Sequence, residues 1–141
     1  MNMSWIVYAL LSAFFAALVA IFGKVGIAKV DTTLATTIRA LIMAGFFVVA
    51  SLALSKFKFT GTIDKSALTF IALSGLAGAL SWLFYFMALK GGPASHVAAL
   101  DRTSVVMVFV IAVLFVGEKF HLRTAVGALL VVSGAILMSL K

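Results

Sequence analysis

Residues 66–89 read SALTFIALSGLAGALSWLFYFMAL, a run that contains no Asp, Glu, Lys or Arg. A bilayer core of about 30 Å needs roughly 20 apolar residues in one helix to cross it. The run is long enough for this, and its apolar residues are continuous rather than alternating as they do in the strands of a membrane barrel. The stretch therefore predicts a transmembrane helix.

Four further stretches have the same character, and short polar loops separate them. The predicted helices cover residues 4–22, 33–55, 66–89, 95–116 and 124–140. Ser95 is the expected N-cap of the fourth helix, because its hydroxyl can accept from a free N–H group of the first turn. No linker divides the chain, so we expect an all-α integral membrane protein in which residues 1–141 form one compact five-helix bundle.

The composition supports the same fold class. Of the 141 residues, 65% are hydrophobic and 11% are charged, whereas a soluble domain is about half apolar and about a quarter charged. Cysteine is absent, which excludes disulfides and thiolate metal sites. The sequence has no phosphate-binding loop and no metal-ligand spacing, so we expect no cofactor, no metal and no enzymatic activity.

The net charge of +7 comes from cations that are scattered over the loops and form no basic stripe. They indicate contact with membrane lipids rather than with nucleic acid. Lys and Arg in short loops also set the orientation of a membrane protein. In this chain they are almost evenly divided between the two sides of the membrane. The side of the N-terminus is expected to hold Lys56, Lys58, Lys65, Lys119 and Arg123, and the opposite side Lys24, Lys29, Lys90 and Lys141. Two alternatives stay open, namely a fixed orientation with a cytoplasmic N-terminus and insertion in both orientations.

Arg39 and Asp101 lie inside predicted helices, where a charge costs a few kcal/mol and usually faces a cavity or a partner. Both are roughly 9–10 Å from the starts of their helices, which begin on the same side. Arg102 follows Asp101 directly and points elsewhere, so Arg39 is the candidate partner of Asp101. With Arg102 and His96 these residues suggest a polar vestibule that favours anionic or zwitterionic solutes. The alternative is that both arginines extend to the lipid headgroups.

One face of the third predicted helix combines small and hydroxyl residues with aromatic ones. Ser74, Gly78, Ser81 and Tyr85 follow each other at helical spacing, and Trp82 lies beside them. This face could line a solute path. It could equally serve helix packing, which in lipid favours small residues.

Two pairs near the C-terminus complete the set of candidates. Gly127 and Gly134 lie on one face of the fifth predicted helix and indicate either packing within one protomer or a contact between protomers. Glu118 and Lys119 follow the fourth helix at the membrane interface, where we expect a structural role rather than proton coupling.

These residues together resemble one repeat of the drug/metabolite transporter superfamily, of the EamA type. The resemblance covers the whole chain and is carried by FGKVG at 22–26, VD at 30–31, Arg39, FYFMALKGG at 84–92, LFVGEK at 114–119, Arg123, Gly127 and SG at 133–134. The fourth helix departs from the common Pro-Val pattern, because residues 100–106 read LDRTSVV. This stretch is similar to the half-length branch of the family.

Full-length members of this family resemble two five-helix repeats of opposite orientation around a central site, as in inverted-repeat transporters. The resemblance therefore implies a secondary transporter of small metabolites or drugs in the cytoplasmic (inner) membrane. We expect it to work by alternating access as an antiparallel homodimer with dual topology and a substrate path between the protomers. Asp101 is the candidate coupling group, since the first helix carries no acid. The alternatives are an accessory half-subunit of a heteromeric transporter and a flippase for a lipid-linked sugar.

Overall fold

The structure is a computed structural model and describes residues 4–140. The described chain is helical without strands, and five helical stretches are long and apolar enough to cross a membrane. They are Trp5–Gly26, Thr32–Ala53, Lys65–Gly91, Ala94–Val116 and Leu122–Ser139. The prediction of an all-α membrane protein with five spans is confirmed, and helix starts and ends differ from the expected ones by only a few residues.

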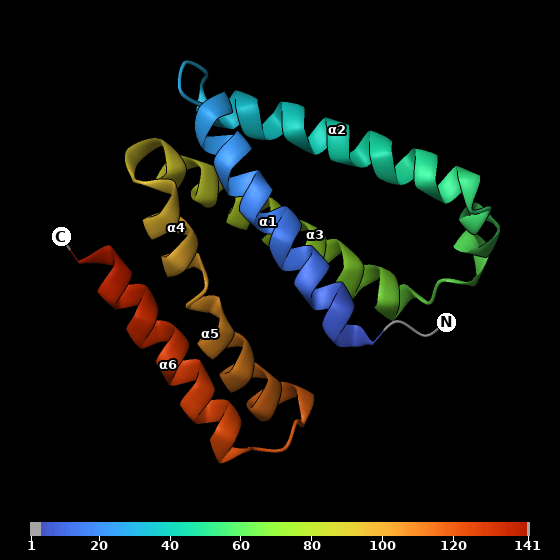
Figure 1. The fold of residues 1–141 in the computed structure, drawn as a ribbon. Coiled ribbons are helices and arrows are strands. Elements are labelled where there is room, and N and C mark those ends of the chain that lie inside the picture. Colours follow the sequence, from blue (N-terminus) through green and yellow to red (C-terminus); the bar gives the residue numbers. More distant parts are fainter. Residues whose placement is uncertain (1–3, 141) are drawn as a thin grey trace. The chain divides into compact units, whose positions relative to one another are not determined.

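The chain folds as two compact units. The first unit contains residues 4–24 and 91–140 of the described chain, with α1 (Trp5–Gly26), α4 (Ala94–Asp101), α5 (Ser104–Ile111) and α6 (Leu122–Ser139). In this unit α4 and α5 follow one another along α6, as Figure 1 shows. Ala128 and Ala135 of α6 are buried. They are seven residues apart and therefore share one face, which lets the helices approach closely.

The fourth span is not one continuous α-helix. It breaks between α4 and α5, where the N–H groups of Arg102 and Thr103 donate to carbonyls three residues earlier, at 3.1 and 3.0 Å. The break coincides with the polar run from Asp101 to Ser104. The start of α4 also differs from the prediction that Ser95 is its N-cap. Pro93 rather than Ser95 is the N-cap, since Pro93 is the last extended residue.

A π-helical turn, η2 (Ala112–Val116), follows α5 and ends at Gly117. Gly117 has φ +79°, a left-handed conformation that costs a residue with a side chain about 1–2 kcal/mol. The N–H groups of Gly117 and Glu118 both donate to the Ala112 carbonyl. The glycine therefore ends the span and turns the chain toward α6.

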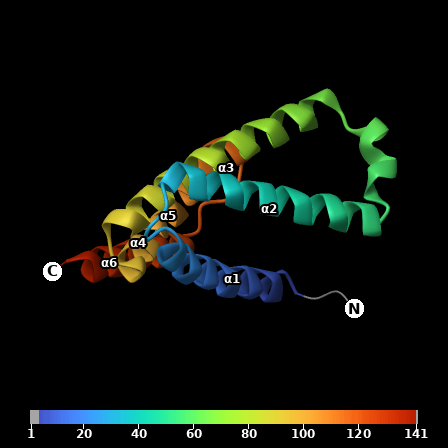
Figure 2. The same ribbon diagram turned by 90° about the horizontal axis from the view of Figure 1, so that it is seen from above.

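The second unit covers residues 25–90 and consists of α2 (Thr32–Ala53), the 3-10 helix η1 (Lys56–Thr62) and α3 (Lys65–Gly91). The loop expected at 56–65 thus contains a helical turn. Asp31 is the N-cap of α2, and its carboxylate accepts from the Leu34 N–H at 3.0 Å. The two long helices converge at the start of α2 and the end of α3 and diverge toward η1 (Figures 1 and 2).

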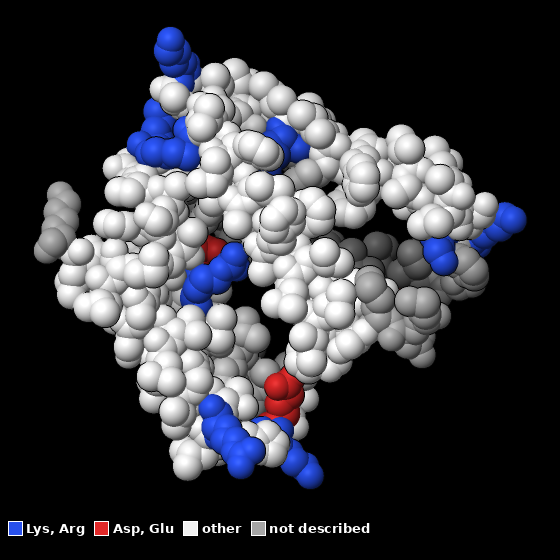
Figure 3. All heavy atoms as spheres, in the orientation of Figure 1, with Lys and Arg blue, Asp and Glu red and all other residues white. Residues whose placement is uncertain are grey.

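The surface of the described chain is predominantly apolar. Large side chains such as Phe14, Phe46, Phe84 and Phe115 are exposed, and no polar or charged side chain that the structure describes is buried. On the face in Figure 3, Lys and Arg occur in small groups between wide uncharged areas. This distribution fits a protein whose solvent is lipid over most of its surface.

Candidate functional site

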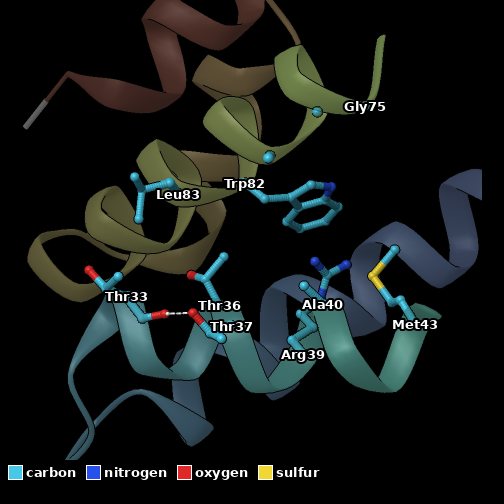
Figure 4. Close-up of a pocket in the computed structure, with 11 residues that line it drawn as sticks. Thr33, Thr36, Thr37, Arg39, Ala40, Met43, Gly75, Trp82 and Leu83 are labelled. Carbon is cyan, nitrogen blue, oxygen red and sulfur yellow. Dashed lines mark hydrogen bonds between the residues drawn. The ribbon is translucent and has the colours of Figure 1, made fainter. Parts of the chain in front are cut away.

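A pocket of about 550 Å³ lies between α2 and α3, within the second unit (Figure 4). Residues from both helices line it: Thr33, Thr36, Thr37, Arg39, Ala40 and Met43 from α2, and Gly75, Gly78, Ala79, Trp82 and Leu83 from α3. Small residues on α3 leave the space open, because glycine and alanine fill little of the gap between diverging helices. Arg39 is the one charged residue among those described as lining this pocket.

The guanidinium group of Arg39 stacks on the indole ring of Trp82. Its carbon atom Cζ lies 3.6 Å from the ring centroid of Trp82 and 5.6 Å from that of Phe86. A guanidinium above an aromatic face is worth about 0.5–2 kcal/mol, most when water is excluded. The stack offsets part of the cost of a cation in an apolar helix. It also holds the guanidinium group at the pocket.

Stacking leaves the edge of the guanidinium available. The Arg39 side chain is half-buried, and within the described part of the second unit its N–H groups have no hydrogen-bond acceptor or carboxylate partner. Figure 4 shows its nitrogen atoms directed into the space between the two helices. Planar N–H donors in this arrangement match the oxygen atoms of a carboxylate or phosphate.

Trp82 is itself held in an aromatic cluster on α3. Its ring meets Tyr85 edge-on at 5.5 Å and Phe86 at 6.1 Å between centroids. Phe86 is buried and Trp82 and Tyr85 are half-buried. Edge-to-face contacts at such distances fix ring orientation. The indole face that supports Arg39 is therefore a rigid wall of the pocket.

Hydroxyl groups of α2 form the polar part of the opposite wall. The Thr36 hydroxyl donates to the Thr32 carbonyl at 2.7 Å, and the Thr37 hydroxyl donates to the Thr33 carbonyl at 2.9 Å. Because these protons are engaged within the helix, the hydroxyl oxygens retain lone pairs that can accept a hydrogen bond from a ligand. Thr36 precedes Arg39 by three residues, which places both on one side of α2.

A lysine joins the two helices where they converge. The Nζ atom of Lys90, in the last turn of α3, donates to the Val30 carbonyl just before α2 at 2.9 Å. In the first unit, Lys24 in the last turn of α1 similarly donates to the Gly92 carbonyl at 2.8 Å. Cations at helix C-termini are also favoured by the helix dipole. Each contact ties the end of a helix to a neighbouring segment of its own unit.

The structure brings four of the residues predicted to line a solute path together. Arg39, Gly78 and Trp82 line the pocket, and Tyr85 lies behind Trp82. Ser74 and Ser81 are exposed and are not among the described lining residues. The wall from α3 contains Gly78 of the predicted face together with Gly75 and Ala79, which lie roughly 100° or more around the helix from Ser74.

Asp101, Arg102 and His96 belong to the first unit, so the pairing of Asp101 with Arg39 stays a prediction. Asp101 is the last residue of α4, and Arg102 caps that helix. Both are exposed, and His96 is half-buried in α4. All three therefore lie at or before the break in the fourth span, where irregular backbone in membrane proteins usually lines a cavity.

The remaining candidates lie in or near α6. Gly127 and Gly134 are exposed, and a Cβ atom at either position would meet no atom within 4 Å in the described chain. They lie beside the buried pair Ala128 and Ala135. Glu118 and Lys119 are exposed in the turn after Gly117, and their structural role stays a prediction.

Sequence reasoning missed the threonines of the pocket. In the sequence, nothing distinguishes Thr33, Thr36 and Thr37 from the rest of the apolar span. The available signal was the spacing of Thr36 from Arg39, because residues three apart share a helix face. A charged residue inside a span makes the other polar residues of its face candidates for the same site.

Comparisons with known proteins agree with these observations. The model of the EamA-like transporter family matches residues 3–140. An uncharacterized transporter in the cobO 3′ region of Sinorhizobium sp is 43% identical over 139 residues, which are 99% of each chain. A probable 4-amino-4-deoxy-L-arabinose-phosphoundecaprenol flippase subunit, ArnF, of Pseudomonas savastanoi pv. phaseolicola is 34% identical over 83 residues, 57% of this chain and 61% of that protein. No solved structure matches the chain.

Proposed function

The chain belongs to the EamA-like transporter family, and from this premise we propose that it carries a small anionic or zwitterionic metabolite or drug across the cytoplasmic membrane. As a member of this family it is a multi-pass membrane transporter and not an enzyme. The proposed mechanism is secondary transport by alternating access.

One observation carries the proposal. Arg39 sits inside an apolar span, stacked on Trp82, with its N–H donors toward an open pocket. A cation in a membrane helix is costly, and such residues usually face a partner or a substrate path. The surrounding Met43, Ala40 and Leu83 contribute apolar contacts, as in most small-molecule sites. An anion at Arg39 would neutralise the charge during passage.

A homodimer fits the protein best. The relative from Sinorhizobium sp aligns with this chain over nearly its whole length, so it too has about the length of one five-helix repeat. Two copies in opposite orientations would rebuild the inverted-repeat arrangement that many secondary transporters use. The almost balanced Lys and Arg content of the loops favours insertion in both orientations.

Cysteine labelling tests the orientation directly, because the chain contains no Cys. Lys29 and Lys58 lie at opposite ends of α2, in the preceding loop and in η1. We would introduce Lys29→Cys or Lys58→Cys and label intact cells with an impermeant maleimide. Partial labelling of both variants supports the antiparallel homodimer. Labelling of one variant alone contradicts it and favours a parallel dimer or an oppositely oriented partner.

A flippase for a lipid-linked sugar is the second candidate, and the accessory half-subunit is a third. The similarity to a probable flippase subunit favours both. The pocket lies between helices that diverge toward η1, an arrangement that suits the lateral entry of an amphiphile. A ligand that binds the folded protein raises its thermal stability. Stabilisation only by lipid-linked sugars would favour the flippase, and recovery in a stoichiometric complex with a different membrane protein would favour the subunit.

A further inference from the structure

We propose that the α2–α3 pocket recognises two groups of one ligand at once, an oxyanion at Arg39 and a hydrogen-bond donor at Thr36 and Thr37. The inference rests on the proposed function and narrows its substrate class. The ligand is a small organic phosphate or carboxylate that also carries hydroxyl or ammonium groups, free in solution or as the headgroup of a lipid.

The first half of the site follows from how Arg39 is held. Trp82 covers one face of the guanidinium at 3.6 Å, and Phe86 lies at 5.6 Å. A covered face leaves the in-plane N–H donors for recognition, and these donors pair bidentately with carboxylate or phosphate oxygens. Lysine could not do this, since its ammonium group is a point charge without a planar fork.

The second half follows from the direction of the threonine hydroxyl bonds. Thr36 and Thr37 donate their protons to the Thr32 and Thr33 carbonyls at 2.7 and 2.9 Å. Toward the pocket they therefore offer oxygen lone pairs, which accept and do not donate. An oxyanion placed against these oxygens would be repelled, whereas a ligand hydroxyl or ammonium group would be bound.

Thr36 shares a face of α2 with Arg39, and Thr37 lines the pocket from the adjacent side of the same helix. Thr36 and Arg39 are three residues apart, so their backbones are separated by about 4–5 Å along the axis of α2. The threonines lie nearer the end at which α2 and α3 converge, and Arg39 lies deeper. The ligand is thus oriented with its donor groups toward the end where Lys90 bonds Val30 and its acid toward the middle of the span.

Three probes with one carbon skeleton separate the two contacts. Glycerol 3-phosphate has both groups, propyl phosphate has only the anion, and glycerol has only the donors. We would measure dissociation constants from ligand-induced thermal stabilisation of the full chain in lipid nanodiscs. We expect glycerol 3-phosphate to bind about five- to tenfold more tightly than propyl phosphate, the effect of about one net hydrogen bond, and glycerol not to bind.

Variants assign the difference to residues. In the double variant Thr36→Val, Thr37→Val the two phosphates should bind equally, with the affinity for propyl phosphate retained. Thr69→Val is the matched control, because its hydroxyl also donates to the carbonyl four residues earlier, that of Lys65 at 2.9 Å, but it is exposed on α3 outside the pocket. Arg39→Lys should weaken both phosphates, whereas Arg123→Lys, at an exposed arginine of α6, should not.

The 1-octanoyl ester of glycerol 3-phosphate distinguishes the two sources of the ligand. If both the free and the esterified compound bind, the ligand is a soluble substrate. If only the ester binds, the ligand is a lipid headgroup, and octyl phosphate then replaces propyl phosphate in the comparison. Two results would overturn this inference and leave the anion site at Arg39 in place. One is equal binding of the phosphates with and without hydroxyl groups. The other is that the double threonine variant still binds the phosphate with hydroxyl groups more tightly than the one without. Absence of binding by every phosphate overturns it together with the proposed function.

Discussion

The guanidinium carbon of Arg39 lies 3.6 Å from the centroid of the Trp82 indole ring. The contact joins α2 to α3 across the pocket, and it places the charge of the site directly on a chromophore. Binding of an anion to Arg39 should therefore change the fluorescence of Trp82.

The chain contains two tryptophans, Trp5 and Trp82, so each can be observed alone. In Trp5→Phe we expect propyl phosphate to shift or quench the emission of Trp82 in a saturable way, because the charge over its ring is neutralised. In Trp82→Phe the remaining Trp5, 78% exposed in α1, should not respond. An equal response of both variants would show that the phosphate does not act at the pocket.

Replacement of Arg39 should separate stability from function. Arg39→Leu removes a charge that costs about 2.5–3.5 kcal/mol near the centre of a span and loses a stack worth about 0.5–2 kcal/mol. We therefore expect the folded protein in nanodiscs to gain about 0.5–3 kcal/mol of stability, with ligand stabilisation abolished. A variant that unfolds instead would show that the stack is mainly structural.

Asp101→Asn tests the coupling role. If Asp101 carries the coupling proton or pairs with Arg39, the substitution should lower gradient-driven transport about tenfold or more, because the amide cannot ionise. The fold should be retained, because asparagine has the same shape as aspartate. Transport by proteoliposomes with and without an imposed pH gradient measures this, and Asp64→Asn in the exposed turn before α3 is the control. Unchanged transport of Asp101→Asn would remove Asp101 from the mechanism.

Gly117→Ala should destabilise the fold by about 1 kcal/mol, because Gly117 has φ +79° and alanine is strained there. Gly26→Ala, at the end of α1 where an added Cβ atom would meet no atom within 4 Å, is expected to cost less. Thermal unfolding of both variants in the same detergent gives the comparison. Equal midpoints would indicate that the turn after η2 adapts to a side chain.

Neighbouring residues of α6 should respond differently to the same enlargement. Ala128→Leu adds volume at a residue that is 5% exposed and should destabilise the fold by about 1–3 kcal/mol through overpacking. Gly127→Leu points into open space within the described chain and should leave the stability of one protomer unchanged. A fall in the stability of both variants alike would contradict the observed face of α6.

If Gly127 and Gly134 form the contact between protomers, Gly127→Leu should lower the dimer fraction, because small residues let helices approach closely in lipid. Fluorescence transfer between labelled copies in liposomes, diluted over a range of lipid ratios, measures this fraction. Gly45→Leu, an equally open glycine of α2, serves as the control. An unchanged dimer fraction in Gly127→Leu would place the contact on another face.

The spans were predictable because long apolar runs with few charges leave few alternatives in lipid, and helix starts and ends deviate by only a few residues. The break after Asp101 was not predicted, since hydropathy does not register it and neither Pro nor Gly occurs there. The polar run up to Ser104 is the signal that was available. The contact of Arg39 with Trp82 depends on the register between α2 and α3, which no spacing within a single helix specifies.

The helices of this protein differ in length, and one bilayer must accommodate them all. α3 has 27 residues and α6 has 18, so they measure about 40 and 27 Å at 1.5 Å per residue. A long helix in a hydrocarbon layer of about 30 Å relieves the mismatch by tilting. Because α3 forms one wall of the pocket, a thinner bilayer should tilt it further and alter the opening beside α2. Membrane thickness thus becomes a variable that can modulate access to Arg39.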